Sequence, residues 1–277
     1  MNRRLLVILI IMIAAVISLA VFMGKGHRKS AKVTKSTNVT APVSSSAGAL
    51  LARAKDFEAK GNLWEAKLVY QQLIAAYANS PEVMDWQKKS EELNMGLLFS
   101  PAITPKSVSY EIKHGDTLTK IAKEFKTTTQ LIMKSNHLSD DKIVPGRKIK
   151  VWNTPFSILV DKSQNILMLK SGEEILKTYI VSTGVNNSTP VGTYKINNKL
   201  VNPTWFKAGA VVAPGSADNL LGTRWLGFDL PGYGIHGTID PQSLGKQVTQ
   251  GCVRMANSEV EELYSIVPTG IEVTIVD

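Results

Sequence analysis

The chain has 277 residues, a formal net charge of +9, four histidines and a single cysteine, Cys252. One cysteine excludes an internal disulfide and any metal site built from several cysteines, and the histidines show no metal-ligand spacing. We therefore expect no metal. The net positive charge is typical either of an ordinary solvated surface or of a protein that binds an acidic polymer. Nucleic acid is not expected, because no arginine-rich helix, zinc-finger spacing or aromatic RNA-binding motif is present.

The N-terminal region contains an uncharged, almost wholly apolar run over residues 5–23. At about 1.5 Å per residue, such a run nearly spans a hydrocarbon core of about 30 Å. A cleaved signal peptide has a shorter apolar region, so we expect an uncleaved transmembrane anchor and a membrane partner. More basic residues follow the run than precede it, which favours a cytoplasmic C-terminus, whereas the downstream domains favour the opposite orientation. The Ser/Thr-rich residues 24–48 predict a flexible linker.

Residues 49–99 show helical periodicity, with a break at Gly61 and a stop followed by a restart at Pro81. The segment resembles one tetratricopeptide-like hairpin with a third helix, on the positions of Ala54, Gly61, Ala66 and Tyr70. One repeat is too few for an ordinary array. The segment is therefore either a helical spacer or the surface for a protein partner.

Residues 108–152 predict a strand, two helices and a strand. Asp116 or Thr117 can cap the first helix, and Thr128 or Thr129 can begin the second. Across its whole length this stretch resembles a LysM domain, through motifs that include "GDTL" at 115–118 and "PG" at 145–146. The resemblance implies binding of glycans that contain N-acetylglucosamine, mostly peptidoglycan or chitin, in a shallow groove between two loops. The implied glycan-binding residues are Gly115, Asp116, Thr117, Leu118, Leu138 and Ile143.

Residues 156–277 alternate apolar and polar positions in short runs, which predicts a β-rich domain. The first three runs are typical of a meander with breaks at 162–165 and 171–173. Residues 257–267 predict one helix with Asn257 or Ser258 as its cap, and the last residues predict a closing strand. We expect a β-sandwich with one helix, and thus a multidomain α+β chain.

Cys252 lies in "TQGCVRM", sixteen positions after His236 in "GIHGT". A lone cysteine is ordinarily a small apolar core residue. Here Gly251 permits an unusual turn and close substrate approach, and Arg254 adds a positive charge that favours the thiolate. Cysteine with a nearby histidine is the minimum set for thiol acyl transfer.

The same region resembles the L,D-transpeptidase (YkuD-like) catalytic domain. The matching pieces are "STGVNNSTPVGTYKI", "NPTW", "GTRWLGF", "GYGIHGT" and "TQGCVRM", and the resemblance covers about 156–277. One position departs from the pattern, because Gln250 stands where the family usually has a second histidine. Gln250 can hydrogen-bond but cannot carry a charge or shuttle a proton, so slower acylation is expected.

The resemblance implies that Cys252 attacks a peptidoglycan stem tetrapeptide, with His236 as base and the backbone N–H groups of Gly251 and Cys252 as oxyanion donors. A stem amine would then resolve the thioester into a cross-link, whereas water would give L,D-carboxypeptidase activity. No cofactor is implied. The remaining residues expected around the substrate are Arg254, Gln250, Thr249, Gly237, Tyr233 and Trp225.

Two other interpretations stay open. A peptidoglycan-binding scaffold with a degenerate site would account for Gln250, and a cysteine hydrolase of other amides would keep the site but change the substrate. The expected location is the bacterial cell envelope, with an anchor in the cytoplasmic membrane and the catalytic domain outside it.

Overall fold

The computed structural model describes residues 46–207 and 209–277. The predicted anchor at 5–23 and nearly all of the predicted linker lie outside the described residues. Within the described ranges, no helix combines the length and the apolar character needed to cross a membrane. The chain divides into two compact units, Met1–Leu93 and Asn94–Asp277, and each is considered by itself.

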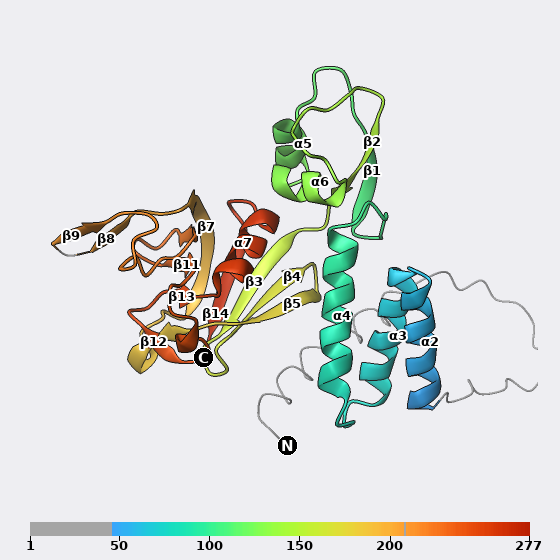
Figure 1. Cartoon of the computed structure of the whole chain (residues 1–277), viewed down its shortest axis with the longest axis horizontal. Coiled ribbons are helices and arrows are strands. Elements are labelled where there is room, and N and C mark those ends of the chain that lie inside the picture. Colours follow the sequence, from blue (N-terminus) through green and yellow to red (C-terminus); the bar gives the residue numbers. More distant parts are fainter. Residues whose placement is uncertain (1–45, 208) are drawn as a thin grey trace, which may run out of the picture. The chain divides into compact units, whose positions relative to one another are not determined.

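The first unit contains the helical segment that the sequence predicts (Figure 1). Its helices are α2 (Ala47–Ala59), α3 (Leu63–Ala76) and the first part of α4 (Val83–Leu98). Gly61 has a φ of +72° at the break between α2 and α3, a conformation that suits glycine. Ala54 and Ala66 are fully buried, and the Tyr70 hydroxyl donates to Glu58 at 2.6 Å. The expected hairpin and third helix are confirmed, while the tetratricopeptide likeness and a protein partner stay predictions.

The second unit begins with a small β–α–α–β arrangement, as predicted. Strands β1 (Ser107–Glu111) and β2 (Lys148–Trp152) pair antiparallel, and α5 (Leu118–Glu124) and α6 (Thr129–Ser135) lie between them in the sequence. Thr117 Oγ1 accepts the N–H of Lys120 at 3.2 Å, and Thr128 Oγ1 accepts the N–H of Leu131 at 2.9 Å. Both helices therefore begin with threonine caps, as the sequence predicts.

The rest of the second unit is built on an eight-stranded sheet, within the part of the chain that the structure describes. Its order is β13-β11-β10-β7-β14-β3-β4-β5. The bounds are β3 (Phe156–Asp161), β4 (Ile166–Ser171), β5 (Glu174–Ile180), β7 (Gly192–Val201), β10 (Arg224–Phe228), β11 (Gly234–His236), β13 (Val253–Arg254) and β14 (Glu272–Val276). The predicted meander of three strands is confirmed as β3, β4 and β5.

The sheet is continuous, whereas a sandwich of two sheets was expected. The reason is the length of β7, which pairs with β14 through residues 192–195 and with β10 through residues 196–201. Shorter pairs lie beside the sheet: β6 (Thr183–Gly184) with β12 (Gln247–Thr249), and β8 (Trp205–Lys207) with β9 (Ala210–Val212). Figure 1 shows the β8–β9 hairpin extending away from β7.

Helix α7 (Asn257–Ile266) lies beside β10 and β11 (Figure 1). Its buried residues Val260, Leu263 and Ile266 join the core under the sheet, as their spacing of three residues predicts. The predicted cap is wrong: Ala256 occupies the capping position without a side-chain bond. The Asn257 side chain instead accepts hydrogen bonds from the loops that follow β11 and precede β10.

The small β–α–α–β domain is packed against the sheet domain inside the second unit. Leu131 of α6 belongs to the same buried cluster as the sheet residues and α7. Thr128 Oγ1 donates to the Ser265 carbonyl, and Lys134 Nζ donates to Ser265 Oγ at 2.9 Å. These contacts bring α6 directly against α7, so the two domains share a core.

Candidate functional site

Cys252 lies immediately before β13, and its side chain is partly accessible. Cys252 Sγ donates to the Gly232 carbonyl at 3.5 Å. The preceding Gly251 has a φ of +133°, and a Cβ atom there would approach Tyr233 Cε1 to 2.7 Å. The unusual backbone conformation predicted for Gly251 is confirmed. The close neighbour is Tyr233, and the approach of substrate to Gly251 stays a prediction.

His236 is the buried last residue of β11. Its Nδ1 lies 2.6 Å from the Gly237 carbonyl oxygen, and because a carbonyl can only accept, Nδ1 carries the proton. The lone pair of the neutral ring is then on Nε2, the atom that can act as a base. The Trp225 ring stacks on the imidazole with the ring centroids 6.1 Å apart.

Strand pairing brings the segments that carry His236 and Cys252 side by side. In the parallel pair β11–β13, Ile235 lies opposite Val253 and His236 lies opposite Arg254. Cys252 directly precedes β13 and therefore lies two residues before the position opposite His236. The segments that carry the two motifs are thus neighbours, while the contact between thiol and imidazole stays a prediction.

The pKa shifts at the site favour an uncharged pair. Burial lowers the pKa of His236 to about 4, against a weaker opposing effect of the Gly237 carbonyl. Burial likewise raises the pKa of the Cys252 thiol, and this outweighs the Gly234 hydrogen bond and the Arg254 charge, which lower it. The resting site therefore holds a thiol and a neutral imidazole, where the sequence suggested a thiolate favoured by Arg254.

Arg254 is a buried cation, with 9% of its surface exposed. Its Nη1 donates to Ser243 Oγ at 3.0 Å, and its Nε is buried with no hydrogen-bond partner in the structure. The backbone of Arg254 exchanges two hydrogen bonds with Ser182. The side chain thus acts on the thiol through its charge, from a position that the backbone fixes.

Thr249 closes the turn that precedes Cys252 with two side-chain hydrogen bonds. Thr249 Oγ1 donates to the Cys252 carbonyl at 2.6 Å and accepts the Gly251 N–H at 3.2 Å. The Gly251 N–H is therefore engaged in the resting structure, which bears on its expected role as an oxyanion donor. Gln250, between these residues, is exposed to solvent.

Gly237 is required for the approach of Asn257, a residue that the sequence predicts only as a helix cap. A Cβ atom on Gly237 would lie 2.1 Å from Asn257 Oδ1. That oxygen accepts the N–H of Thr223 at 3.2 Å and of Thr238 at 3.0 Å. Asn257 thus fixes the residues that follow His236, and nothing in its local sequence distinguishes this role from capping.

The loop at 184–189 is a second element that the sequence alone did not assign to the site. A Cβ atom on Gly184 would lie 3.0 Å from the Gly251 Cα. Lys162, only 2% exposed, holds this loop by donating to the Thr189 carbonyl at 2.8 Å and pairing with Asp277 at 2.9 Å. The "STGVNNSTP" motif indicated the loop in the sequence, whereas no sequence feature around Lys162 indicated its role.

The small domain carries its own groove, with a volume of about 540 Å³, at the predicted pair of loops. Four of the six predicted glycan-binding residues line it: Asp116, Thr117, Leu118 and Ile143. Asp116 also accepts from the Tyr110 hydroxyl at 2.9 Å and from the Lys113 N–H at 2.8 Å, so it has a structural role as well. Gly115 and Leu138 are not among the residues that line this groove.

Among the described residues, no group of three or more His, Cys, Asp and Glu side chains is arranged to hold a metal ion. The residues that the site itself offers for chemistry are the thiol, the imidazole and the nearby backbone groups.

Comparison with known proteins gives two family matches: an L,D-transpeptidase catalytic domain over residues 155–275 and a LysM domain over residues 110–152. YkuD of Bacillus subtilis (strain 168), named as an L,D-transpeptidase, is 34% identical over 61% of this chain and 98% of its own length. YqjB of the same organism, named likewise, is 40% identical over 43% of this chain and 70% of its own length.

Solved structures give a weaker likeness. An L,D-transpeptidase from Mycobacterium smegmatis is 17% identical with a TM-score of 0.39, over 49% of this chain and 65% of that one. An Enterococcus faecium L,D-transpeptidase is 18% identical with a TM-score of 0.38, over 44% and 49%. The chain thus spans less than two thirds of either structure. On the sequence relatives, this chain belongs to the L,D-transpeptidase family and carries a LysM domain ahead of its catalytic domain.

Proposed function

We propose that the protein is a cell-envelope L,D-transpeptidase that forms a thioester on Cys252 with a peptidoglycan stem peptide. The observation that carries this proposal is the parallel pairing of β11 with β13, because Cys252 directly precedes β13 and His236 ends β11. A buried neutral imidazole with its lone pair on Nε2 is suited to remove the thiol proton.

In the acylation step, His236 Nε2 takes the proton from Cys252 Sγ as the sulfur attacks the carbonyl before the terminal D-alanine. The backbone N–H of Cys252 stabilises the oxyanion, and Gly251 can contribute when its N–H leaves Thr249 Oγ1. Collapse of the tetrahedral intermediate breaks the C–N bond, and the imidazolium protonates the departing D-alanine amine. The product is an acyl-enzyme thioester.

In the second step, the side-chain amine of another stem attacks the thioester carbonyl and loses a proton to His236. The C–S bond breaks, the thiol is restored, and a cross-link between two stems results. With water as the acceptor, the same steps release a shortened peptide, which is the L,D-carboxypeptidase alternative.

The test is mass spectrometry of the protein incubated with disaccharide-tetrapeptide, beside Cys252→Ala. Loss of D-alanine with formation of dimers, absent in the variant, is the expected result. Loss of D-alanine without dimers would assign a carboxypeptidase. No turnover and no acyl-enzyme would contradict the proposal.

A second candidate, a peptidoglycan-binding scaffold with a weak site, is favoured by the raised pKa of Cys252 and by the exposed Gln250. Gln250→His separates the two candidates. A gain in acyl-enzyme formation from an inactive start would support the scaffold, whereas an active parent excludes it.

We further propose that residues 5–23 anchor the protein in the cytoplasmic membrane with the catalytic domain outside. The length and apolar character of the run support this proposal. Protease digestion of intact spheroplasts tests it, because an outward catalytic domain is degraded while a cytoplasmic marker survives. Protection of the catalytic domain would overturn the orientation.

A further inference from the structure

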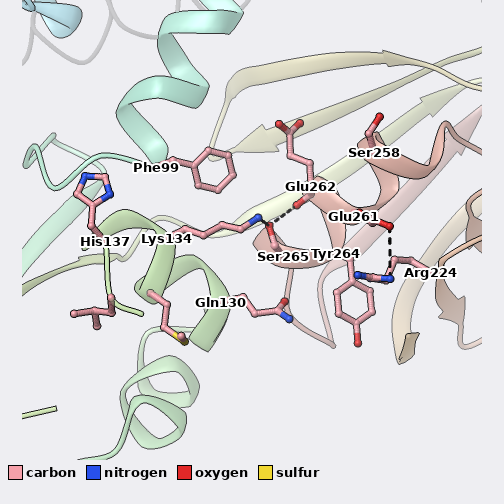
Figure 2. A pocket seen from close by; sticks show the side chains of 12 residues that line it. Phe99, Gln130, Lys134, His137, Arg224, Ser258, Glu261, Glu262, Tyr264 and Ser265 are labelled. Carbon is pink, nitrogen blue, oxygen red and sulfur yellow. Dashed lines mark hydrogen bonds and ion pairs between the residues drawn. The ribbon is translucent and has the colours of Figure 1, made fainter. Parts of the chain in front are cut away.

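A groove with a volume of about 820 Å³ is lined by residues of α6 in the LysM domain and of α7 in the catalytic domain. Figure 2 shows it from close by. Gln130, Lys134 and His137 line it from α6 and the turn that follows. The residues of α7 that line the groove are three and four positions apart, so they lie on one face of that helix. These residues are Ser258, Glu261, Glu262 and Ser265.

The two walls are held in place by direct contacts. Lys134 Nζ donates to Ser265 Oγ at 2.9 Å across the groove (Figure 2), and Thr128 donates to the Ser265 carbonyl. Leu131, on another side of α6, is buried in the core of the catalytic domain. The groove is therefore formed by contacts within the protein, and binding in it needs little rearrangement.

The charged groups of the groove contact other groups of the protein, and the Lys134 ammonium, which donates to Ser265 Oγ, lies 5.2 Å from the centre of the Phe99 ring. Arg224 lies 3.7 Å from Glu261, and Glu262 accepts from Lys177 at 2.6 Å. What remains for a ligand is the Gln130 amide and the Ser258 hydroxyl. Beside them lie Met133 and the rings of Phe99 and Tyr264, each of which has a cation of the protein over one face. Such a lining suits a neutral ligand with hydroxyl and amide groups and apolar ring faces, which describes an N-acetylhexosamine chain.

The groove adjoins the LysM groove. Met133 lines both of them, and its neighbours on α6 divide between the two sides: Thr129 faces the LysM groove and Gln130 faces the α6–α7 groove. We infer that the α6–α7 groove is a second saccharide subsite, and that one chain containing N-acetylglucosamine runs from the LysM groove over Met133 into it. This inference rests on the proposed glycan binding by the LysM groove.

The test is calorimetric titration of the full chain in detergent with short and long oligomers of N-acetylglucosamine. A trimer probes the LysM groove, and an octamer can reach both grooves. Gln130→Trp blocks the second groove from an exposed position, and Asp140→Trp blocks the LysM groove alone. Glu124→Trp, exposed on α5 and outside the residues that line either groove, is the matched control.

We expect the octamer to bind about tenfold or more tightly than the trimer. Gln130→Trp should reduce octamer affinity to the trimer level and leave the trimer unchanged, Asp140→Trp should weaken both, and Glu124→Trp should change neither. In hydrogen exchange, the octamer alone should protect amides of α7.

If Gln130→Trp still bound the octamer more tightly than the trimer by the wild-type factor, the second subsite would be wrong. LysM binding would stand, provided that Asp140→Trp weakened the binding of both oligomers. Failure of the wild type to bind either oligomer would overturn the subsite and the LysM role together. The D-alanine release assay reports on the catalytic proposal independently of these outcomes.

Discussion

At the scale of single residues, the charge on Arg254 sets how readily Cys252 becomes a thiolate. Burial raises the thiol pKa, and the Arg254 charge opposes that effect. In Arg254→Met the opposing charge is lost, so the thiol pKa should rise further. Alkylation by iodoacetamide near pH 8 should then slow, by about tenfold if the thiol pKa is higher by one. The measurement is the alkylation rate as a function of pH.

The shape of the same pH profile separates a neutral pair from an ion pair. If the thiol lies beside a neutral imidazole, the alkylation rate should rise as the pH increases through the alkaline range. If the two form a thiolate–imidazolium pair, the alkylation rate should be constant from acid to neutral pH. A plateau in the wild type would contradict the neutral resting state. Ser258→Ala, a change on the exposed surface of α7, is the control and should leave the profile unchanged.

His236 also links stability to pH. Its pKa is about 4 in the folded protein, below the ordinary 6.5, so the unfolded chain binds this proton more readily. The stabilisation from the neutral ring is therefore complete above about pH 6.5 and is lost as the pH falls toward 4, to a limit of about 3 kcal/mol.

Urea unfolding of wild type and His236→Gln across this pH range measures the effect. The difference in unfolding free energy between the two proteins should narrow as the pH falls from about 6.5 to 4, because only the wild type has this group to protonate. A constant difference would show that the folded histidine titrates at its ordinary pKa.

At the scale of elements, Asn257 connects the start of α7 to the loop after His236. Asn257→Ala removes the acceptor of two backbone N–H groups, those of Thr223 and Thr238. We expect a loss of about 2–4 kcal/mol in unfolding free energy. Acylation should fall as well, because the strand end that holds His236 is no longer fixed.

Asn257→Asp is the matched comparison, because it keeps an acceptor oxygen in place. It should recover most of the stability and much of the acyl-enzyme formation, measured by urea unfolding and intact-protein mass spectrometry. If Asn257→Ala lost stability but kept the wild-type acylation rate, the positioning role would be wrong and only a structural role would remain.

Lys162 holds another element, the loop at 184–189 that packs against Gly251. Lys162→Met keeps the buried aliphatic stem and removes the ammonium that contacts Thr189 and Asp277. A loss of about 1–3 kcal/mol in stability is expected, since buried carbonyl groups lose their donor. Asp277→Asn is the milder comparison, because its exposed carboxylate contributes little.

The kinetic readout for Lys162 is acylation by the tetrapeptide under conditions where both proteins are folded. A lower acylation rate with an unchanged rate for iodoacetamide would place the defect in substrate positioning. An equal fall in both rates would indicate that the thiol itself is disturbed, which contradicts a role through the loop.

These elements show what the sequence can and cannot predict. Alternation and spacing predicted the LysM strands and helices, the β3–β5 meander and α7, because one buried face determines each pattern. Motif chemistry predicted that the segments of His236 and Cys252 lie together, and the β11–β13 pair confirms this for the backbone. The positions of Asn257 and Lys162 did not follow from the sequence, because the backbone groups that they contact lie between 19 and 34 residues away along the chain.

The continuous sheet escaped prediction for a related reason. Ten residues of β7 form one strand, but nothing local shows that its two halves pair with different neighbours. The charge state of Cys252 was also misjudged, since Arg254 is evident in the sequence while the depth of burial is a property of the folded protein.

At the scale of the second unit, the LysM domain is packed onto the catalytic domain and is not merely tethered to it. Adjacent residues of α6 serve different cores: Leu131 is buried with the catalytic domain, and Ile132 is buried in the LysM core. Both side chains are 1% exposed, so they form a matched pair for truncation to alanine. Each should cost about 2–5 kcal/mol.

The two truncations should differ in where the loss appears. Ile132→Ala should speed hydrogen exchange within α5, α6 and the β1–β2 pair. Leu131→Ala should instead speed exchange on both sides of the shared core, in α6 and in α7, because it removes packing between the domains. Exchange that changes only inside the LysM domain in both variants would show that the domains are not coupled. Coupling as expected would mean that a glycan bound on the LysM side is held at a fixed position relative to α7, and through Asn257 relative to the loop after His236.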